Sequence, residues 1–139
     1  MLHRFRRSSH GSMTVEFGLI APLLLLLVFG FIGFCVELSS ASGLQQLAAE
    51  AARASIGGLT DAERTQIVQA FVTAHAGTYP FLDAQKLTVA TSALVSPTAF
   101  QVSLSYDLTS GIVGMVSSLV PMLPTQVHRS AIVLISTAL

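Results

Sequence analysis

The sequence is poor in the residues from which disulfide frameworks, metal sites and most active sites are built. Among its 139 residues there is one cysteine, there is no tryptophan, and only 10% of the residues are charged. A single cysteine forms neither an intrachain disulfide nor a cysteine-based metal cluster. That residue, Cys35, lies inside an apolar run, where a free cysteine usually behaves as a small buried hydrophobic residue. We therefore expect no disulfide, no metal site and no cofactor.

Motifs for catalysis are also missing. The sequence has no G-x-S-x-G elbow, no phosphate-binding glycine loop and no histidine pair at zinc-binding spacing. An active site needs groups of matched pKa that converge in a cleft. The carboxylates beyond the apolar run show no recognisable spacing, and His75 and His128 are the histidines available there. We predict a structural subunit without catalytic residues, and not an enzyme, and we interpret His75 as a structural, half-buried side chain.

Positive charge is concentrated at the N-terminus. The formal net charge is zero, but residues 1–11 contain Arg4, Arg6 and Arg7 and no acidic residue. Without these residues the chain has 4 basic and 7 acidic side chains, a net charge of −3. Nucleic-acid binding requires a basic face, so we expect no nucleic-acid partner.

What the sequence does contain is a long apolar run, with 20 uncharged residues from Phe17 to Val36. As an α-helix this run is about 30 Å long, which is the thickness of the hydrocarbon core of a bilayer. We predict that it is a membrane-spanning helix. Because the three arginines before the run outnumber the single Arg53 in the first 20 residues after it, the positive-inside rule places the N-terminus in the cytoplasm and the bulk of the chain outside.

Glu16 directly precedes this run. A carboxylate at the edge of a membrane helix has to be solvated, neutralised or paired, and at the bilayer centre it costs about 2.5–3.5 kcal/mol. A cut after Gly11 would make Ser12 the N-terminal residue, with an α-amine one helical turn from Glu16. That amine has an ordinary pKa of about 7.7–8.0 and would be largely protonated near neutral pH. Glu16 could then pair with the amine of its own chain or of a neighbouring chain.

A basic leader, a glycine, and then glutamate five residues after the cut, followed by Phe17 and a leucine-rich run, resemble the type IV pilins. More narrowly, GSMTVEFGLIAPLLLLLVFGF resembles the TadE-like minor pseudopilins of the tight-adherence (Flp-type) pilus system. Three features carry the narrower resemblance: the Glu16-Phe17 pair, Ala21-Pro22 early in the helix, and the small-residue segment 48–58. The resemblance is specific over residues 11–57.

This resemblance implies cleavage between Gly11 and Ser12 by a membrane-embedded prepilin peptidase, with Ser12, Glu16 and Phe17 acting in assembly. Ser12 departs from the apolar residue that many pilins carry at the first mature position. The implied partners are the peptidase, other pilin or pseudopilin subunits and an inner-membrane assembly platform. The implied location is the inner membrane, crossed once, or an extracellular pilus used in adhesion or secretion.

Two other readings of the N-terminus stay open. The run could be a secretory signal peptide cleaved near the small residues 39–43, although it is longer than usual and begins with a carboxylate. It could also be an uncleaved anchor for an extracytoplasmic binding domain, with Glu16 in the head-group region. Small and helix-weakening residues in the run fit either close helix packing or simple tolerance in lipid; they are Gly18, Pro22, Gly30 and Gly33.

Beyond the run the sequence predicts an α+β domain. The first helix continues to Ile56 and ends at Gly57-Gly58, and a capping box formed by Thr60 and Glu63 starts a second helix that runs to about Ala76. We predict three parts, namely a leader (1–11), a transmembrane and stalk helix (12–57) and a small extracytoplasmic domain (58–139). Because a domain of that size is marginally stable, we expect it to pack against the long helix.

Three strand-like segments predict a small antiparallel sheet, over residues 86–95, 100–108 and 126–136. In the second segment, apolar and polar residues alternate, which predicts one buried face. The third contains five consecutive apolar residues, 131–135, which predicts a central strand or one buried on both faces. The uncharged segment 112–123 is too short and too broken to span a membrane. It fits a loop or short helix folded over the sheet, or a patch that docks at an interface or partner.

Overall fold

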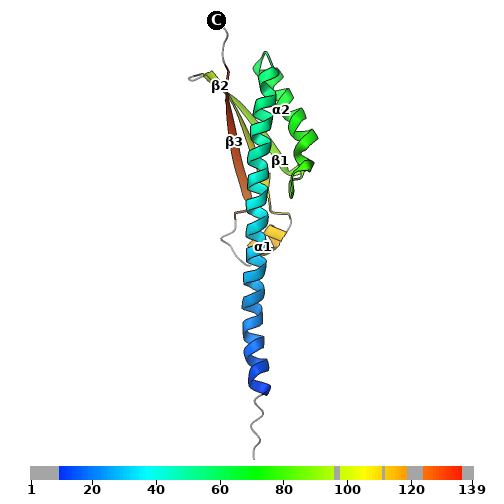
Figure 1. The fold of residues 1–139 in the computed structure, drawn as a ribbon, viewed down its shortest axis with the longest axis vertical. Helices are drawn as coiled ribbons and strands as arrows, with labels where there is room; N and C mark the ends of the chain where they lie inside the picture. The colour runs from blue at the N-terminus through cyan, green and yellow to red at the C-terminus, as the bar shows by residue number, and fades with distance from the viewer. Residues whose placement is uncertain (1–9, 96–97, 111, 119–123, 136–139) are drawn as a thin grey trace, which may run out of the picture.

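The computed structural model describes residues 10–95, 98–110, 112–118 and 124–135. A long helix, α1 (His10–Ala54), and a shorter helix, α2 (Asp61–His75), pack on one face of a three-stranded antiparallel sheet. Its strands are β1 (Leu87–Val95), β2 (Thr98–Asp107) and β3 (Gln126–Leu134). A short helix, α3 (Ile112–Ser117), follows β2 and precedes β3 in the sequence. The predicted α+β architecture is therefore confirmed, and Figure 1 shows α1 extending far beyond the domain.

The two halves of α1 have different surroundings. From Met13 to Ile32 every residue is exposed except Ala21 and Gly30, which are half-buried. In the C-terminal half, side chains recur at helical spacing on one face and are fully buried; they are Leu44, Leu47, Ala48 and Ala51. This half of α1 is one wall of the domain's core, as the small size of the remaining chain led us to expect.

The sheet forms the opposite wall. β2 is the central strand and pairs antiparallel with both neighbours. Its buried residues alternate along the strand as predicted, and they are Phe100, Val102, Leu104 and Tyr106. The polar residues between them lie on the other face, which is not covered by a helix in the described part of the chain.

The predicted position of the third strand is wrong. β3 pairs only with β2 and is an edge strand of the three-stranded sheet. Successive side chains of β3 point to opposite faces of the sheet. Ala131 and Val133 pack against the core, whereas Ile132 and Leu134 are 59% and 68% exposed. A run of apolar residues is typical of a doubly buried strand, but here two of the five residues 131–135 face outward.

The predicted capping box of α2 is confirmed. The Thr60 hydroxyl accepts a hydrogen bond from the Glu63 amide at 3.2 Å, and the Glu63 carboxylate accepts one from the Leu59 amide at 2.9 Å. Val68 and Val72 then bury the inner face of the helix against the core. At the other end, His75 is exposed rather than half-buried as predicted, and it stacks on Phe71 with ring centroids 4.2 Å apart.

Candidate functional site

The residues predicted to act in processing and assembly lie in the first two turns of α1. The helix begins at His10, so Gly11, Ser12 and Glu16 are part of one continuous helix. Ser12 and Glu16 are four residues apart, which places them on the same side of the helix, one turn from each other. Glu16 and Phe17 are both exposed. The backbone therefore provides the spacing that a pair between the Ser12 amine and the Glu16 carboxylate would need.

Among the described residues, α1 is the one helix long and apolar enough to cross a membrane. Its most apolar stretch has a mean hydropathy of 2.8, and only 6% of that stretch is buried within the protein. A core helix of a soluble protein would be mostly buried. The exposed leucine, valine, isoleucine and phenylalanine side chains surround the whole helix, so this half of α1 requires lipid or another apolar surface.

The predicted helix-packing residues differ in their surroundings. A methyl group added at Gly18 or Gly30 would have no heavy atom within 4 Å, whereas Gly33 is buried. Pro22 lies inside α1 and is exposed. At Gly18, Pro22 and Gly30, any close packing would therefore be with another molecule. Cys35 is exposed rather than buried, because the domain covers only part of the helix at this level.

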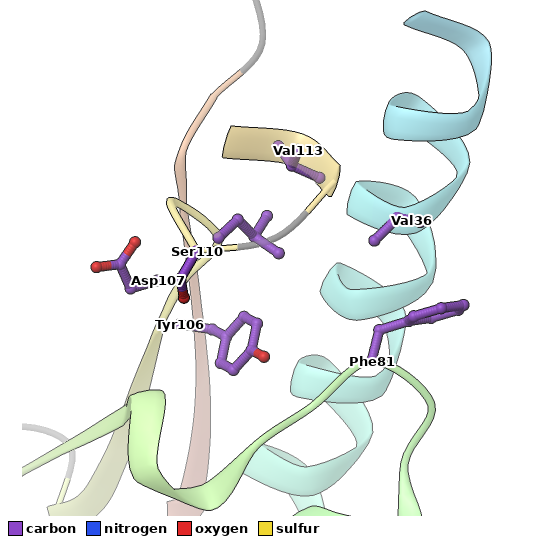
Figure 2. A pocket seen from close by; sticks show the side chains of 7 residues that line it. Val36, Phe81, Tyr106, Asp107, Ser110 and Val113 are labelled. Atoms are coloured by element: carbon purple, nitrogen blue, oxygen red, sulfur yellow. The ribbon is translucent and has the colours of Figure 1, made fainter. Parts of the chain in front are cut away.

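A small cavity of about 150 Å³ lies where the domain meets the end of the apolar run (Figure 2). Its lining comes from α1, from the loop between α2 and β1, from the end of β2 and from α3, and consists of Val36, Phe81, Tyr106, Asp107, Leu108, Ser110 and Val113. Burial raises the pKa of the Tyr106 phenol. No group of three histidine, cysteine or carboxylate residues suited to a metal ion occurs in the described ranges. The cavity is thus a mainly apolar junction.

The polar groups beside this cavity are used in local structure. Hydrogen bonds from Thr109 lower the pKa of the Asp107 carboxyl, and the backbone amide of Thr109 is 2.8 Å from the Asp107 Oδ1. The Lys86 ammonium donates to the Ser110 carbonyl at 3.3 Å. The Asp107 carboxylate points away from the cavity in Figure 2. These bonds hold the turn after β2, from which α3 continues.

The loop between α2 and β1 is held against α1. It packs beside Gly43, where an added methyl group would lie 3.4 Å from both Leu82 Cδ1 and Tyr79 Cβ, in van der Waals contact. The Tyr79 hydroxyl also donates to the Glu50 carboxylate at 2.9 Å. Between these contacts, Phe81 has a φ of 63° and is 58% exposed. A left-handed backbone costs a residue other than glycine about 1–2 kcal/mol, and sequence patterns gave no sign of it.

The packing of α3 leaves no room for a larger side chain at Gly114. A methyl group at this position would overlap the carbonyl oxygen of Thr109. We expect Gly114→Ala to destabilise the domain by about 1–3 kcal/mol, the usual cost of forcing extra volume into a packed site. Urea unfolding of the full chain in detergent, followed by the fluorescence of Tyr79 and Tyr106, measures this.

Gly57→Ala is the matched control, because a methyl group at Gly57 has no heavy atom within 4 Å. We expect its unfolding midpoint to stay close to that of the wild type. Equal midpoints for the two glycine variants would show that α3 is not packed against the turn at Thr109.

Comparison with known families gives a match over the same helix. Residues 11–53 match the family model described as "TadE-like protein". This confirms the resemblance inferred from the sequence over almost the whole segment that carried it. Comparisons with curated proteins and with solved structures found no significant match.

Proposed function

We propose, from the TadE-like match of residues 11–53, that this Tad pilus-associated protein is a minor pilin-like (pseudopilin) subunit of a tight-adherence pilus or related secretion machine. The observation that carries the proposal is the division of α1. Its N-terminal half exposes apolar side chains on all sides, and its C-terminal half is built into a small α+β domain. Such a helix can stay in lipid or join a bundle of similar helices while the domain stays folded.

In the proposed mechanism the helix first holds the subunit in the inner membrane. A prepilin peptidase then cuts between Gly11 and Ser12 and removes the basic leader, residues 1–11. The Glu16 carboxylate pairs with the new amine of Ser12, in its own chain or in a neighbour, as the helix leaves lipid for the bundle. Pairing offsets much of the cost of placing a carboxylate in an apolar environment. The one-turn spacing on a continuous helix supports this step.

The small residues of α1 have a role in the same transfer. Lipid tails and leucine side chains are equally apolar, so association of such helices depends on close packing rather than on the hydrophobic effect. The open space at Gly18 and Gly30 permits a second backbone to approach there. We propose that Gly18, Pro22 and Gly30 shape the surface by which α1 packs against other subunits, with Phe17 at its N-terminal edge, whereas Gly33 is already buried within the protein itself.

The proposed topology follows from the charges. The N-terminus is cytoplasmic, α1 crosses the inner membrane once, and the domain of residues 58–139 lies outside with the C-terminal half of α1. The proposed partners are the prepilin peptidase, other pilin or pseudopilin subunits and the inner-membrane assembly platform.

A helix-swap experiment tests this function against a simple anchor. In one chimaera, residues 18–35 are replaced by an unrelated polyleucine-type span; in its matched control, the same replacement keeps Gly18, Pro22, Gly30 and Gly33. We expect both to insert in the membrane, and only the control to be recovered in sheared filaments or cross-linked to other pilins. If the wild-type chain and both chimaeras stay in the membrane, absent from filaments, and support pilus formation equally, the result would instead favour a signal-anchored extracytoplasmic binding domain.

A further inference from the structure

We propose that the end of the folded domain nearest the apolar run rests on the outer surface of the lipid bilayer, with Phe81 and Met115 inserted among the head groups. This inference depends on α1 crossing the membrane, as proposed above, and adds a second lipid contact made by the domain. We call the two contacting parts, the loop 79–83 and the helix α3, the membrane-facing end.

The depth of this end relative to the bilayer follows from its contacts with α1. Val36 is the last uncharged residue of the run before Glu37. Because the run has about the thickness of the hydrocarbon core, Val36 must lie near the outer boundary of that core. Val36 lines the same cavity as Phe81 and Val113, and Figure 2 shows the loop and α3 at the turns of α1 around it. Whatever packs at Val36 therefore lies at the bilayer surface.

The exposed side chains at this end are apolar and suit the membrane–water interface better than bulk water. α3 turns Val113 into the core, where it is fully buried, and leaves Met115 76% exposed. Phe81 is 58% exposed although its backbone is in a costly left-handed conformation. Strained residues persist only where the surroundings enforce them, and they concentrate at functional positions. Interfacial elements bury Trp, Phe and Leu side chains at the boundary between head groups and acyl chains, so lipid contact gives the exposed phenyl ring a favourable environment.

The charges at this end indicate which lipids it would contact. No residue from Leu108 to Thr125 is charged in the sequence. Among the described residues that flank this end in the sequence, Glu37, Asp83 and Asp107 are acidic and Lys86 is basic, and Lys86 already donates to the Ser110 carbonyl. A net negative end has no attraction for anionic head groups, so the contact depends on apolar insertion. We expect it on neutral lipid and expect little effect of salt.

Single-cysteine labelling of the full chain tests the contact. In a Cys35→Ala background, Phe81→Cys and Met115→Cys each carry an environment-sensitive fluorophore, and the protein is reconstituted in phosphatidylcholine vesicles. The controls are Val95→Cys, 91% exposed at the opposite end of β1, and Leu24→Cys in the middle of the run. Quenchers are nitroxide lipids in the bilayer and iodide in the water.

We expect shallow nitroxide lipids to quench the labels at positions 81 and 115 at least about twofold more than the label at 95, with the reverse order for iodide. Anionic lipid and high salt should change neither result. The substituted side chains are exposed, and tyrosine fluorescence checks that each variant remains folded.

Three other results would overturn the inference. Labels at 81 and 115 that behave like the label at 95, while the label at 24 is quenched by deep nitroxides, would place the domain clear of the membrane and leave the anchor intact. Labels shielded from both quenchers would show that protein, such as a second copy, covers this end. Failure of the label at 24 to meet lipid would contradict both the inference and the membrane helix on which the proposed function depends.

Discussion

Replacing Glu16 with alanine is expected to abolish incorporation of the subunit into filaments while leaving removal of the leader intact. In the proposed bundle, the Ser12 amine and the Glu16 carboxylate neutralise each other in apolar surroundings. Removing one partner of a buried ion pair typically costs about 3–5 kcal/mol, because the other charge stays buried without compensation. That cost lowers the equilibrium for incorporation more than about a hundredfold. The peptidase acts before this pairing, so processing should continue.

Two variants separate charge from shape in this experiment. Glu16→Gln keeps the size and hydrogen-bonding capacity of the side chain and removes its charge, and we expect the same loss. Glu37→Gln removes a carboxylate from the same helix beyond the apolar run, and we expect normal incorporation. The measurement compares the amount of subunit in sheared filaments with that in membranes. Normal incorporation of Glu16→Ala, with the leader removed, would count against the ion pair.

Replacing Gly11 with valine is expected to leave the leader attached. The TadE-like match begins at this glycine, and the resemblance implies that the cut follows it. A β-branched side chain at the cut site would obstruct the peptidase, and the chain would keep Arg4, Arg6 and Arg7 on the cytoplasmic side. Those charges oppose extraction of the helix from the membrane, and no amine would form at Ser12. Intact-mass measurement should show a gain equal to residues 1–11.

Gly18→Val is the matched control for this substitution. It places the same side chain on the same helix, at a glycine with open space around it, seven residues beyond Gly11. We expect normal processing. Identical masses for Gly11→Val and the wild type would show that Gly11 does not define a cut site.

Much of the fold could be predicted because its signals are local. The length of α1 follows from an apolar run that continues into a helical stripe, and the start of α2 follows from Thr60 and Glu63 within one turn. The buried face of β2 follows from strict alternation between Phe100 and Tyr106. Each signal lies within one element and corresponds to one periodicity or one cap.

The features that could not be predicted depend on contacts between distant segments. The edge position of β3 is set by the order of the sheet, which the apolar residues 131–135 do not encode. The left-handed Phe81 lies in a loop that contacts α1 at Gly43 and Glu50, more than 30 residues away in the chain. The placement of α3 against α1, rather than over the sheet, is likewise a tertiary result.

The candidate site was predictable to a different degree. Glu16 stood out because a carboxylate at the start of an apolar run needs a specific physical solution, and the family match covers both Glu16 and Gly11, the residue before the proposed cut. Phe81 and Met115 carried no such signal, because a single exposed apolar residue is ordinary in any sequence. They are connected only because their segments, the loop 79–83 and α3, both contribute to the cavity beside Val36, through Phe81 and Val113.

The N-terminal sequence of the protein isolated from cells tests the central claim most directly. If the chain is processed as a pilin-like subunit, the sequence should begin Ser12-Met13-Thr14-Val15-Glu16. A chain that begins at Met1 would contradict processing and leave an uncleaved anchor, and one that begins near Gly43 would show that the apolar run is a secretory signal.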